Sequence, residues 1–421
     1  MEARTVELPT ARASRSSCRS CGSALERVFA DLGMTPLANS FLRADQLEAM
    51  EPFYPLRALV CDECLLVQLD EYQSPASIFS EYAYFSSYST AWQQHCRAYT
   101  EQIIPRLELD DRSFVVEIAS NDGCLLRNFV ERGIPARGVE PAANVARVAI
   151  DAGLPTVVDF FGRRVARELA AEAQADLIVA NNVVPHTPTL SDMVGGMQML
   201  LAREGTITVE FQHLQKLIAL GEFDTIYHEH FSYFTLGTFD RVLRAHDLAG
   251  YDVEELPTHG GSLRVYAAHA EQNRPASERY QAVLAAEAAA GLHRIDGYAD
   301  FNDKVRQAKR EIVRFFLGLK DEGASIAAYG APAKGNTLLN YCGLGTDVID
   351  FTVDRNPRKQ DTFLPGTHIP VLAPSAIEQA RPDVVFILPW NLRDEVMTQL
   401  AHIREWGGRF AVRYPEMRLY D

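Results

Sequence analysis

The sequence predicts an α/β protein in which a small, cysteine-containing N-terminal module precedes two larger α/β units. Two CxxC pairs mark the module, which ends near residue 75. Strand-like apolar runs then alternate with helical segments over residues 113–211, and the alternation resumes after residue 325. Such alternation implies right-handed crossovers and mainly parallel sheets covered on both faces. We therefore expect three domains, at residues 1–75, 76–272 and 273–421.

The composition is that of an ordinary globular protein with an acidic charge balance. Hydrophobic residues make up 47% and charged residues 23% of the 421 residues, which argues against disorder and coiled coil. The 41 Lys and Arg residues are outnumbered by 56 Asp and Glu residues, and this disfavours a nucleic-acid partner. No apolar run approaches the ~18 residues of a membrane span, and the polar start of the chain lacks the apolar segment of a targeting signal. We expect a cytoplasmic protein with no membrane partner.

Four of the seven cysteines form the pairs Cys18/Cys21 and Cys61/Cys64. Two CxxC pairs in a module too small for a large core are typical of four thiolates around one tetrahedral zinc ion. Because four thiolates leave no open coordination position, we expect this zinc to stabilise the module rather than to catalyse. Free or redox-active thiols are the alternative, for which a single CxxC pair is more typical.

The first α/β unit follows a helical, aromatic segment over residues 78–106. Strands are predicted at 113–120, 136–141, 155–161, 175–184 and 205–211, and helices at 124–133, 142–153, 163–174 and 189–205. Two further strand-like runs, at 251–257 and 262–269, are separated by THGG, a gap too short for a crossover helix. The unit is therefore expected to end in an antiparallel hairpin.

The second α/β unit follows a helical arm over residues 276–320, which is rich in good helix formers. Strands are predicted at 325–332, 347–354, 383–390 and 409–415, and helices at 334–343 and 393–407. This pattern again predicts a parallel, Rossmann-like sheet.

A ligand-binding loop is predicted in EIASNDGCLL, where the candidate residues are Glu117, Ser120, Asn121, Asp122 and Gly123. A strand-to-helix turn of this kind aims backbone N–H groups at a nucleotide-like ligand, and glycine permits close approach. Glu140 ends the next strand, where a carboxylate would accept both ribose hydroxyls. Because Ala119 stands at the first glycine position of GxGxxG, an NAD site is disfavoured. Another Rossmann-type ligand site and a tight structural turn both stay open.

The run IYHEHFSYF places Tyr227, His228, Glu229 and His230 together after the fifth strand. Histidines at i and i+2 project to different faces of a helix, so this run differs from HExxH and is a poor helical chelate. Its phenol, carboxylate and imidazole groups favour acid–base chemistry, and a satisfied polar cluster is the alternative. His186 lies just past the fourth strand, at the carboxyl edge where open α/β sheets bind ligands.

In the second α/β unit, AYGAPAKGNTLLN carries the candidates Lys334, Gly335, Asn336 and Thr337 at a strand-to-helix junction. Backbone amides and one ammonium group there suit a diphosphate, and an ordinary tight turn is the alternative. Arg355, in VDRNPRK, ends a following strand and is a candidate contact to a nucleotide. Arg264, in the hairpin motif HGGSLR, is another candidate, although a plain two-strand turn fits that motif equally well.

The motifs SNDGCLL, GVEP, NNVVPHTP, TIYHEHFSYF, HGGSLRVY and YGAPAKGNTLLN follow the paired-cysteine module in this order. Together they resemble the sugar C-methyltransferases that use S-adenosylmethionine, over nearly the whole chain from Cys18 to about Leu419. The resemblance implies a central class I methyltransferase domain of Rossmann-like fold between the zinc-binding module and a second Rossmann-like α/β domain. The best-known members methylate C-3 of dTDP-linked 4-keto deoxysugars in antibiotic pathways, and the family favours a monomer.

The resemblance also implies roles for single residues. His230 matches the position of the family's base, which removes the C-3 hydrogen that the C-4 ketone acidifies. Glu229 would support this base, while Tyr227 and His186 would hydrogen-bond the 4-oxygen as charge builds there. The remaining residues assigned on this basis are Asn181 for the cofactor, and Tyr82, Tyr84 and His228 for the substrate.

One position departs from the family pattern: Pro185 precedes His186, where a small residue such as alanine is expected. Proline fixes the approach of the chain to His186 and so bears on the shape of the sugar pocket. The reaction type is therefore better defined than the acceptor, and a methyltransferase of the same build acting on oxygen, nitrogen or a nucleotide-free substrate stays open. A non-catalytic zinc-ribbon protein is the alternative from another class, against which the acidic charge and the two α/β units count.

Overall fold

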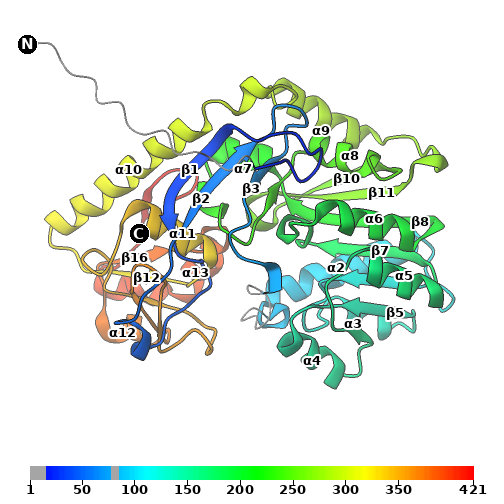
Figure 1. Ribbon diagram of the computed structural model, residues 1–421. Coiled ribbons are helices and arrows are strands. Elements are labelled where there is room, and N and C mark those ends of the chain that lie inside the picture. The colour runs from blue at the N-terminus through cyan, green and yellow to red at the C-terminus, as the bar shows by residue number, and fades with distance from the viewer. Residues whose placement is uncertain (1–15, 77–84) are drawn as a thin grey trace, which may run out of the picture.

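The computed structural model describes residues 16–76 and 85–421, and within them the strands form three sheets (Figure 1). Tyr82 and Tyr84 lie outside these ranges. None of the described helices is long and apolar enough to cross a membrane. The predicted α/β class is confirmed, with a small sheet beside the cysteine pairs and two larger Rossmann-like sheets.

The N-terminal module is an antiparallel sheet in the order β1-β2-β3-β9. Its strands are β1 Arg27–Thr35, β2 Tyr54–Val60, β3 Val67–Leu69 and β9 Ser232–Tyr233. One CxxC pair precedes β1 and the other lies between β2 and β3. The strand β9 comes from far along the chain, where Tyr233 pairs with Val67. The segment that follows the YHEH run therefore completes the sheet of the module.

The central sheet has the order β10-β11-β8-β7-β4-β5-β6. Its strands are β4 Val115–Ile118, β5 Ala136–Val139, β6 Thr156–Val157, β7 Ala175–Asn181, β8 Leu201–Gln212, β10 Leu248–Leu256 and β11 Ser262–His269. Its helices are α2 Thr90–Arg106, α3 Leu126–Val130, α4 Ala143–Asp151, α5 Arg163–Glu172, α6 Leu190–Leu200, α7 Leu214–Leu220 and α8 Leu236–Arg244. Strands β4 to β8 run parallel, and β11 lies antiparallel between β8 and β10. The mainly parallel sheet and its terminal hairpin are as predicted.

The helix predicted over residues 189–205 is shorter in the structure. It ends at Leu200, and Leu201 already pairs with Ala175 of β7 as the first residue of β8. The helix formers of this segment do not extend the helix, because pairing with a buried parallel strand outweighs intrinsic propensity.

The C-terminal sheet has the order β14-β15-β13-β12-β16-β17-β18. Its strands are β12 Ile326–Tyr329, β13 Phe351–Val353, β14 Thr362–Phe363, β15 Pro370–Leu372, β16 Val384–Ile387, β17 Arg409–Val412 and β18 Arg418–Tyr420. Helix α9 Glu278–Ala289 packs against β10 and α8 of the central unit, and the helices of the C-terminal unit are α10 Phe301–Asp321, α11 Ala333–Cys342, α12 Ala376–Ala380 and α13 Arg393–Gln399. The parallel strands β12, β13, β16 and β17 correspond to the predicted ones. Strands β14, β15 and β18 were not predicted, because runs of two or three residues carry no readable period.

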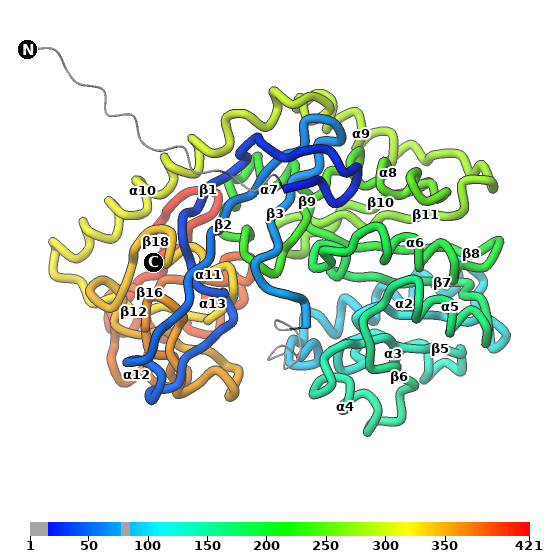
Figure 2. The backbone as a smooth tube through the Cα atoms, viewed as in Figure 1, coloured from blue at the N-terminus to red at the C-terminus, as the bar shows by residue number. Residues whose placement is uncertain are grey.

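The N-terminal module and the C-terminal unit share one hydrophobic core. Phe29 of β1 stacks on Phe301 of α10, with ring centroids 4.5 Å apart, and the cluster continues into β12 and β16. Figure 2 shows the blue N-terminal chain running beside the orange C-terminal unit, to which Leu42 and Phe363 tie it by two backbone hydrogen bonds. The module is thus packed between the two larger units rather than attached at one end.

Candidate functional site

Four sulfur atoms of the N-terminal module lie close enough to share one metal ion. The Sγ atoms of Cys18, Cys21, Cys61 and Cys64 are all within 4.8 Å of one another, and Cys18 Sγ lies 3.5 Å from Cys64 Sγ. Zn–S bonds of about 2.3 Å place the sulfur ligands of tetrahedral zinc ~3.8 Å apart, so this donor set fits zinc. Because four thiolates fill the coordination sphere, the zinc is structural.

A cavity of about 830 Å³ lies where the three parts of the chain meet. Its described lining includes residues 37–40 of the module, the carboxyl ends of β4, β5 and β7, the segment 225–233, and two lysines of the C-terminal unit. Open α/β sheets bind ligands at the carboxyl ends of their strands. The volume is near the upper end of the usual range for ligand sites.

The loop after β4 is held in a rare backbone conformation. Ala119 and Asn121 have φ values of 55° and 51°, which ends the predicted strand early, at Ile118. The Asn121 N–H donates to Glu140 Oε2 at 2.9 Å, and the Ala142 N–H donates to Glu140 Oε1 at 2.8 Å. Burial raises the pKa of Glu140, which both fixes the loop and lines the cavity.

Asn181, at the end of β7, lines the cavity beside this loop. Within the described residues, its side-chain nitrogen and oxygen are both buried without a hydrogen-bond partner. Buried amides in native proteins nearly always have partners, so this amide suits a polar ligand. Asn121, Glu140 and Asn181 are therefore the predicted cofactor residues that the structure brings to the cavity.

The other predicted cofactor residues support the loop from below. Asp122 accepts hydrogen bonds from the backbone N and the Oγ of Ser87, at 3.0 and 2.5 Å, and so fastens the segment before α2. Gly123 lies outside the described lining, and a Cβ there would lie 2.2 Å from Leu154 Cδ1, so the glycine is needed for packing. Glu117 and Ser120 are buried outside the described lining.

The histidine His230 is held by hydrogen bonds on both ring nitrogens. Its Nδ1 lies 2.9 Å from the carbonyl oxygen of Thr225, and its Nε2 lies 2.6 Å from the hydroxyl of Tyr227. A carbonyl only accepts, so Nδ1 carries the hydrogen and Nε2 accepts from the phenol. Burial lowers the pKa of His230 well below its usual value, so the imidazole is neutral at pH 7.

The ring of His186 packs against that of His230 in the lining of the cavity, with ring centroids 4.6 Å apart and ring planes at 73°. Burial lowers the pKa of His186 to about 4. Pro185, the departure from the family pattern, lines the cavity, and its carbonyl accepts from the backbone N–H of Phe231 at 2.7 Å. The turn that carries His186 thus anchors the segment that carries His230.

Glu229 and His228 both line the cavity and both face the N-terminal module. The side-chain amide of Asn39 donates to Glu229 Oε1 at 2.6 Å, and His228 Nε2 donates to the carbonyl of Pro55 at 3.2 Å. Burial raises the pKa of Glu229 to about 7, against the opposing effect of the Asn39 hydrogen bond.

Two half-buried lysines of the C-terminal unit line the cavity, Lys334 at the start of α11 and Lys359. Burial lowers the pKa of Lys334 to about 8 and also lowers the pKa of Lys359. Lys359 Nζ donates to the carbonyl of Ala331 at 2.8 Å. The sequence analysis missed Lys359, although it lies in the VDRNPRK motif that follows β13.

The other predicted substrate residues of this unit are not brought to the cavity. Gly335, Asn336 and Thr337 are buried in α11, where Asn336 donates to the carbonyl of Ala38 at 2.6 Å. Arg355 is largely exposed and pairs with Glu395 at 3.6 Å. Only the start of α11, at Ala333 and Lys334, lines the cavity. The three following residues of this helix are therefore not part of the described lining.

Comparison with known proteins gives the family. The chain matches a zinc-binding domain model over residues 18–79, a methyltransferase domain model over 92–254 and the model of a C-methyltransferase C-terminal domain over 257–415. It is 36% identical over 406 residues to "C-methyltransferase NovU" of Streptomyces niveus, and the match covers 96% of each chain. The chain belongs to the sugar C-methyltransferase family. It is therefore an S-adenosylmethionine-dependent enzyme.

Solved structures are more distant from this C-methyltransferase. A S-adenosylmethionine-dependent methyltransferase from Archaeoglobus fulgidus is 13% identical, with a TM-score of 0.35, and the match covers 42% of this chain and 93% of that chain. The 1,6-didemethyltoxoflavin-N1-methyltransferase of Burkholderia thailandensis is 15% identical, with a TM-score of 0.33, and the match covers 48% of this chain and 94% of that chain.

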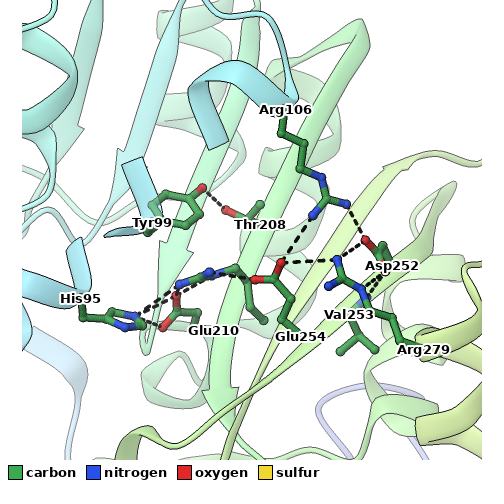
Figure 3. A network of polar contacts seen from close by, with 10 residues as sticks. His95, Tyr99, Arg106, Thr208, Glu210, Asp252, Val253, Glu254 and Arg279 are labelled. Atoms are coloured by element: carbon green, nitrogen blue, oxygen red, sulfur yellow. Dashed lines mark hydrogen bonds and ion pairs between the residues drawn. The ribbon is translucent and has the colours of Figure 1, made fainter. Parts of the chain in front are cut away.

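Arg264 of the C-methyltransferase lies beneath the site instead of in it, which corrects the prediction that it binds substrate. Its side chain donates to Glu210 at 2.7 Å and to Glu254 at 2.9 Å, and its guanidinium lies over the ring of Tyr99. Figure 3 shows the surrounding network of polar contacts, in which His95 reaches Glu210. Two carboxylates already neutralise Arg264, so it ties α2 to β8, β10 and β11 rather than meeting a ligand.

Proposed function

We propose that this C-methyltransferase methylates C-3 of a dTDP-linked 4-keto deoxysugar through an enolate, in the biosynthesis of a deoxysugar-bearing natural product. The observation that carries the proposal is the Tyr227–His230 hydrogen bond of 2.6 Å in a cavity shared with Asn181 and the two lysines. Enolate formation needs a base and hydrogen-bond donors to the oxygen that becomes negative, and a neutral imidazole, a phenol and a second histidine can serve in these roles.

His230 is the proposed base. A ketone acidifies the hydrogen on the neighbouring carbon, and a neutral imidazole with its lone pair on Nε2 accepts that proton. In the structure this lone pair accepts a hydrogen bond from the Tyr227 hydroxyl. We propose that this hydroxyl turns to the ketone oxygen when the acceptor binds, which frees Nε2 and places a donor where negative charge develops. S-adenosylmethionine, when bound, supplies an electrophilic methyl group.

Glu229 and His186 complete the proposed reaction site. Glu229 lines the same cavity as His230, and we propose that its ionised form stabilises the imidazolium that forms when His230 takes the proton. The ring of His186 lies 4.6 Å from that of His230 and is a second hydrogen-bonding group for the ketone oxygen.

The two cavity lysines support a nucleotide-linked acceptor. Lys334 and Lys359 place two ammonium groups in the cavity that the proposed cofactor residues Asn121, Glu140 and Asn181 also line. Lysine ammonium groups recognise phosphate as point charges, so they suit the diphosphate of a sugar nucleotide. We also propose that Tyr82 and Tyr84, which lie outside the described residues, serve the sugar, and that the enzyme acts in the cytoplasm as a monomer.

The decisive experiment is mass spectrometry of the enzyme with S-adenosylmethionine and a panel of dTDP-4-keto-6-deoxysugars in deuterated buffer. We expect a product heavier by one methylene group, and deuterium at C-3 of unreacted sugar. His230→Ala should abolish both while S-adenosylmethionine still binds, and the exposed His293→Ala should change neither. Methylation without exchange at carbon would instead indicate an oxygen or nitrogen acceptor, and normal turnover by His230→Ala would reject the base.

A further inference from the structure

Asp224 is a buried carboxylate that the proposed reaction does not use, and it directly precedes the residue that orients the base. Its side chain is fully buried in the 3₁₀ turn Phe223–Thr225. The next residue is Thr225, whose carbonyl accepts the Nδ1 hydrogen of His230 at 2.9 Å. A movement of this turn would therefore change the hydrogen bond between the Thr225 carbonyl and His230 Nδ1.

Both carboxylate oxygens of Asp224 are held by the C-terminal unit. Oδ1 accepts from the hydroxyl of Tyr414 at 2.5 Å, and Oδ2 accepts from Nε1 of Trp390 at 2.8 Å. A buried carboxylate needs such donors to offset the loss of water. The turn before the YHEH run is thus tied to another part of the molecule.

The same tryptophan touches the cavity lysine. Lys334 Nζ lies 4.0 Å from the centre of the Trp390 ring, and Lys334 also donates to Asn391 beside it. The hairpin tip leaves room for this ring only because it carries glycine: a Cβ on Gly260 would lie 2.4 Å from a Trp390 ring carbon. One side chain therefore contacts both Asp224 and the proposed diphosphate side of the cavity.

The turn has a second anchor on its own unit. The hydroxyl of Thr225 donates to the carbonyl of Glu222 at 2.8 Å, and Oε2 of the Glu222 side chain accepts from Gln212 of β8 at 2.8 Å. Because the turn is anchored at Asp224 and at Thr225, the Thr225 carbonyl is fixed toward Nδ1 of His230.

We infer that Asp224 is a positioning residue: by tying the turn to Tyr414 and Trp390, it holds the Thr225 carbonyl against His230 Nδ1 and so selects the tautomer with its lone pair on Nε2. In a neutral histidine the protonated nitrogen is set by the hydrogen bond that the ring makes. The importance of this tautomer for turnover rests on the proposed function, while the selection of the tautomer does not. The C-terminal unit, which carries the cavity lysines, thereby controls the state of the base.

The test compares two buried tyrosines of the C-terminal unit. Tyr414→Phe removes one donor to Asp224, whereas Tyr329→Phe removes a similar hydrogen bond of 2.9 Å to Gln399, within that unit. Proton–nitrogen correlation spectra of protein labelled with ¹⁵N-histidine report the tautomer, and His230→Gln identifies the signal. We expect the Nδ1–H form of His230 in the wild type and in Tyr329→Phe, and a mixture of tautomers in Tyr414→Phe.

Kinetics provide the second readout. Tyr414→Phe should lower the rate of deuterium entry at the acceptor carbon about tenfold, since small misplacements of a reacting group have effects of this order. The KM for the acceptor and the affinity for S-adenosylmethionine should stay within twofold of the wild type, as should every parameter of Tyr329→Phe. Asp224→Asn, which keeps the volume but replaces one acceptor by a donor, should behave as Tyr414→Phe does.

A wild-type tautomer together with a wild-type exchange rate in Tyr414→Phe would overturn the inference, as would equal losses in Tyr414→Phe and Tyr329→Phe. If no ketosugar exchanges with the wild type, the proposed function fails, and the spectra alone then decide whether Asp224 positions His230.

Discussion

The side-chain amide of Asn39 donates a hydrogen bond of 2.6 Å to Oε1 of Glu229, and so joins the zinc-bearing module to the YHEH run. The two residues are 190 positions apart in the chain. Asn39 lies in a loop that lines the cavity, and the neighbouring Ala38 carbonyl accepts from Asn336 of the C-terminal unit. The N-terminal module therefore builds part of the site as well as holding zinc.

Removing the Asn39 side-chain amide should raise the pKa of Glu229 and so weaken its proposed support of His230. The hydrogen bond lowers the pKa of Glu229 while burial raises it, so in Asn39→Ala the carboxyl should ionise at a higher pH than in the wild type. We expect turnover to fall about tenfold or more, and the rising limb of the pH–rate profile to move to higher pH. Asn302→Ala is the matched control, because Asn302 accepts a hydrogen bond from β1 outside the cavity. Equal profiles for the two variants would contradict the assignment.

The buried carboxyl of Glu222 should make stability depend on pH. Burial raises its pKa from 4.5 to about 8, so between these values the folded protein binds a proton that the unfolded chain has released. Stability from this group is therefore full at low pH and is lost as pH rises toward 8. Glu222→Gln should raise the Tm at pH 8 by a few °C but not at pH 5. The control variant Glu255→Gln, at an exposed position, should leave the Tm unchanged at both pH values. If Glu222→Gln keeps the pH dependence of Tm that the wild type shows, Glu222 is not the group responsible.

Loss of zinc should disturb the segment that carries His230, because β9 directly follows this segment and pairs with β3 of the zinc-binding module. Cys61→Ser removes one of the four clustered sulfurs, and the affected sheet includes Ser232 and Tyr233, just after His230. We expect lower zinc content by elemental analysis, a lower Tm and a loss of methyl transfer. Cys342→Ser changes a buried cysteine of the C-terminal unit that is not in the cluster, and it should retain zinc. Full activity in zinc-free protein would show that the module is dispensable for the site.

Lys359 should recognise the nucleotide part of the acceptor. Its half-buried side chain lines the cavity, so Lys359→Met should raise the KM for a sugar nucleotide about tenfold, as expected for one lost charge-assisted hydrogen bond. The kcat should change little. Lys309→Met, on α10 over the ring of Tyr341, is the control. A kcat effect without a KM effect would assign Lys359 to the chemistry instead.

The sequence predicted those features whose signals are local. Two CxxC pairs are sufficient to predict a four-sulfur cluster, and the short THGG gap is sufficient to predict the β10–β11 hairpin. Tyr227 and His230 lie three residues apart, and their hydrogen bond is a property of one turn. His186 could be added because parallel strands end at the same edge of the sheet.

Features that depend on register or on distant partners were not predictable. Arg264 lies opposite Glu210 on one side and Glu254 on the other in the sheet, so its role as a buried ion-pair partner appears only when strand pairing is known. Lys359 and Asn39 reach the cavity through loops, where no periodicity indicates direction. The pairing of β9 with β3 joins residues whose spacing along the chain gives no hint of contact.

That pairing has a consequence for how the protein is made. A nascent chain has all four zinc-cluster cysteines once Cys64 leaves the ribosome, but β3 keeps an open edge until Ser232 and Tyr233 follow, past the middle of the chain. An unpaired edge strand is a template for wrong pairing, so the emerging polypeptide carries this hazard while the whole central sheet up to β8 is being synthesised. Shortened versions that stop after the first domain will keep the same edge open permanently, and aggregation during expression is the expected result.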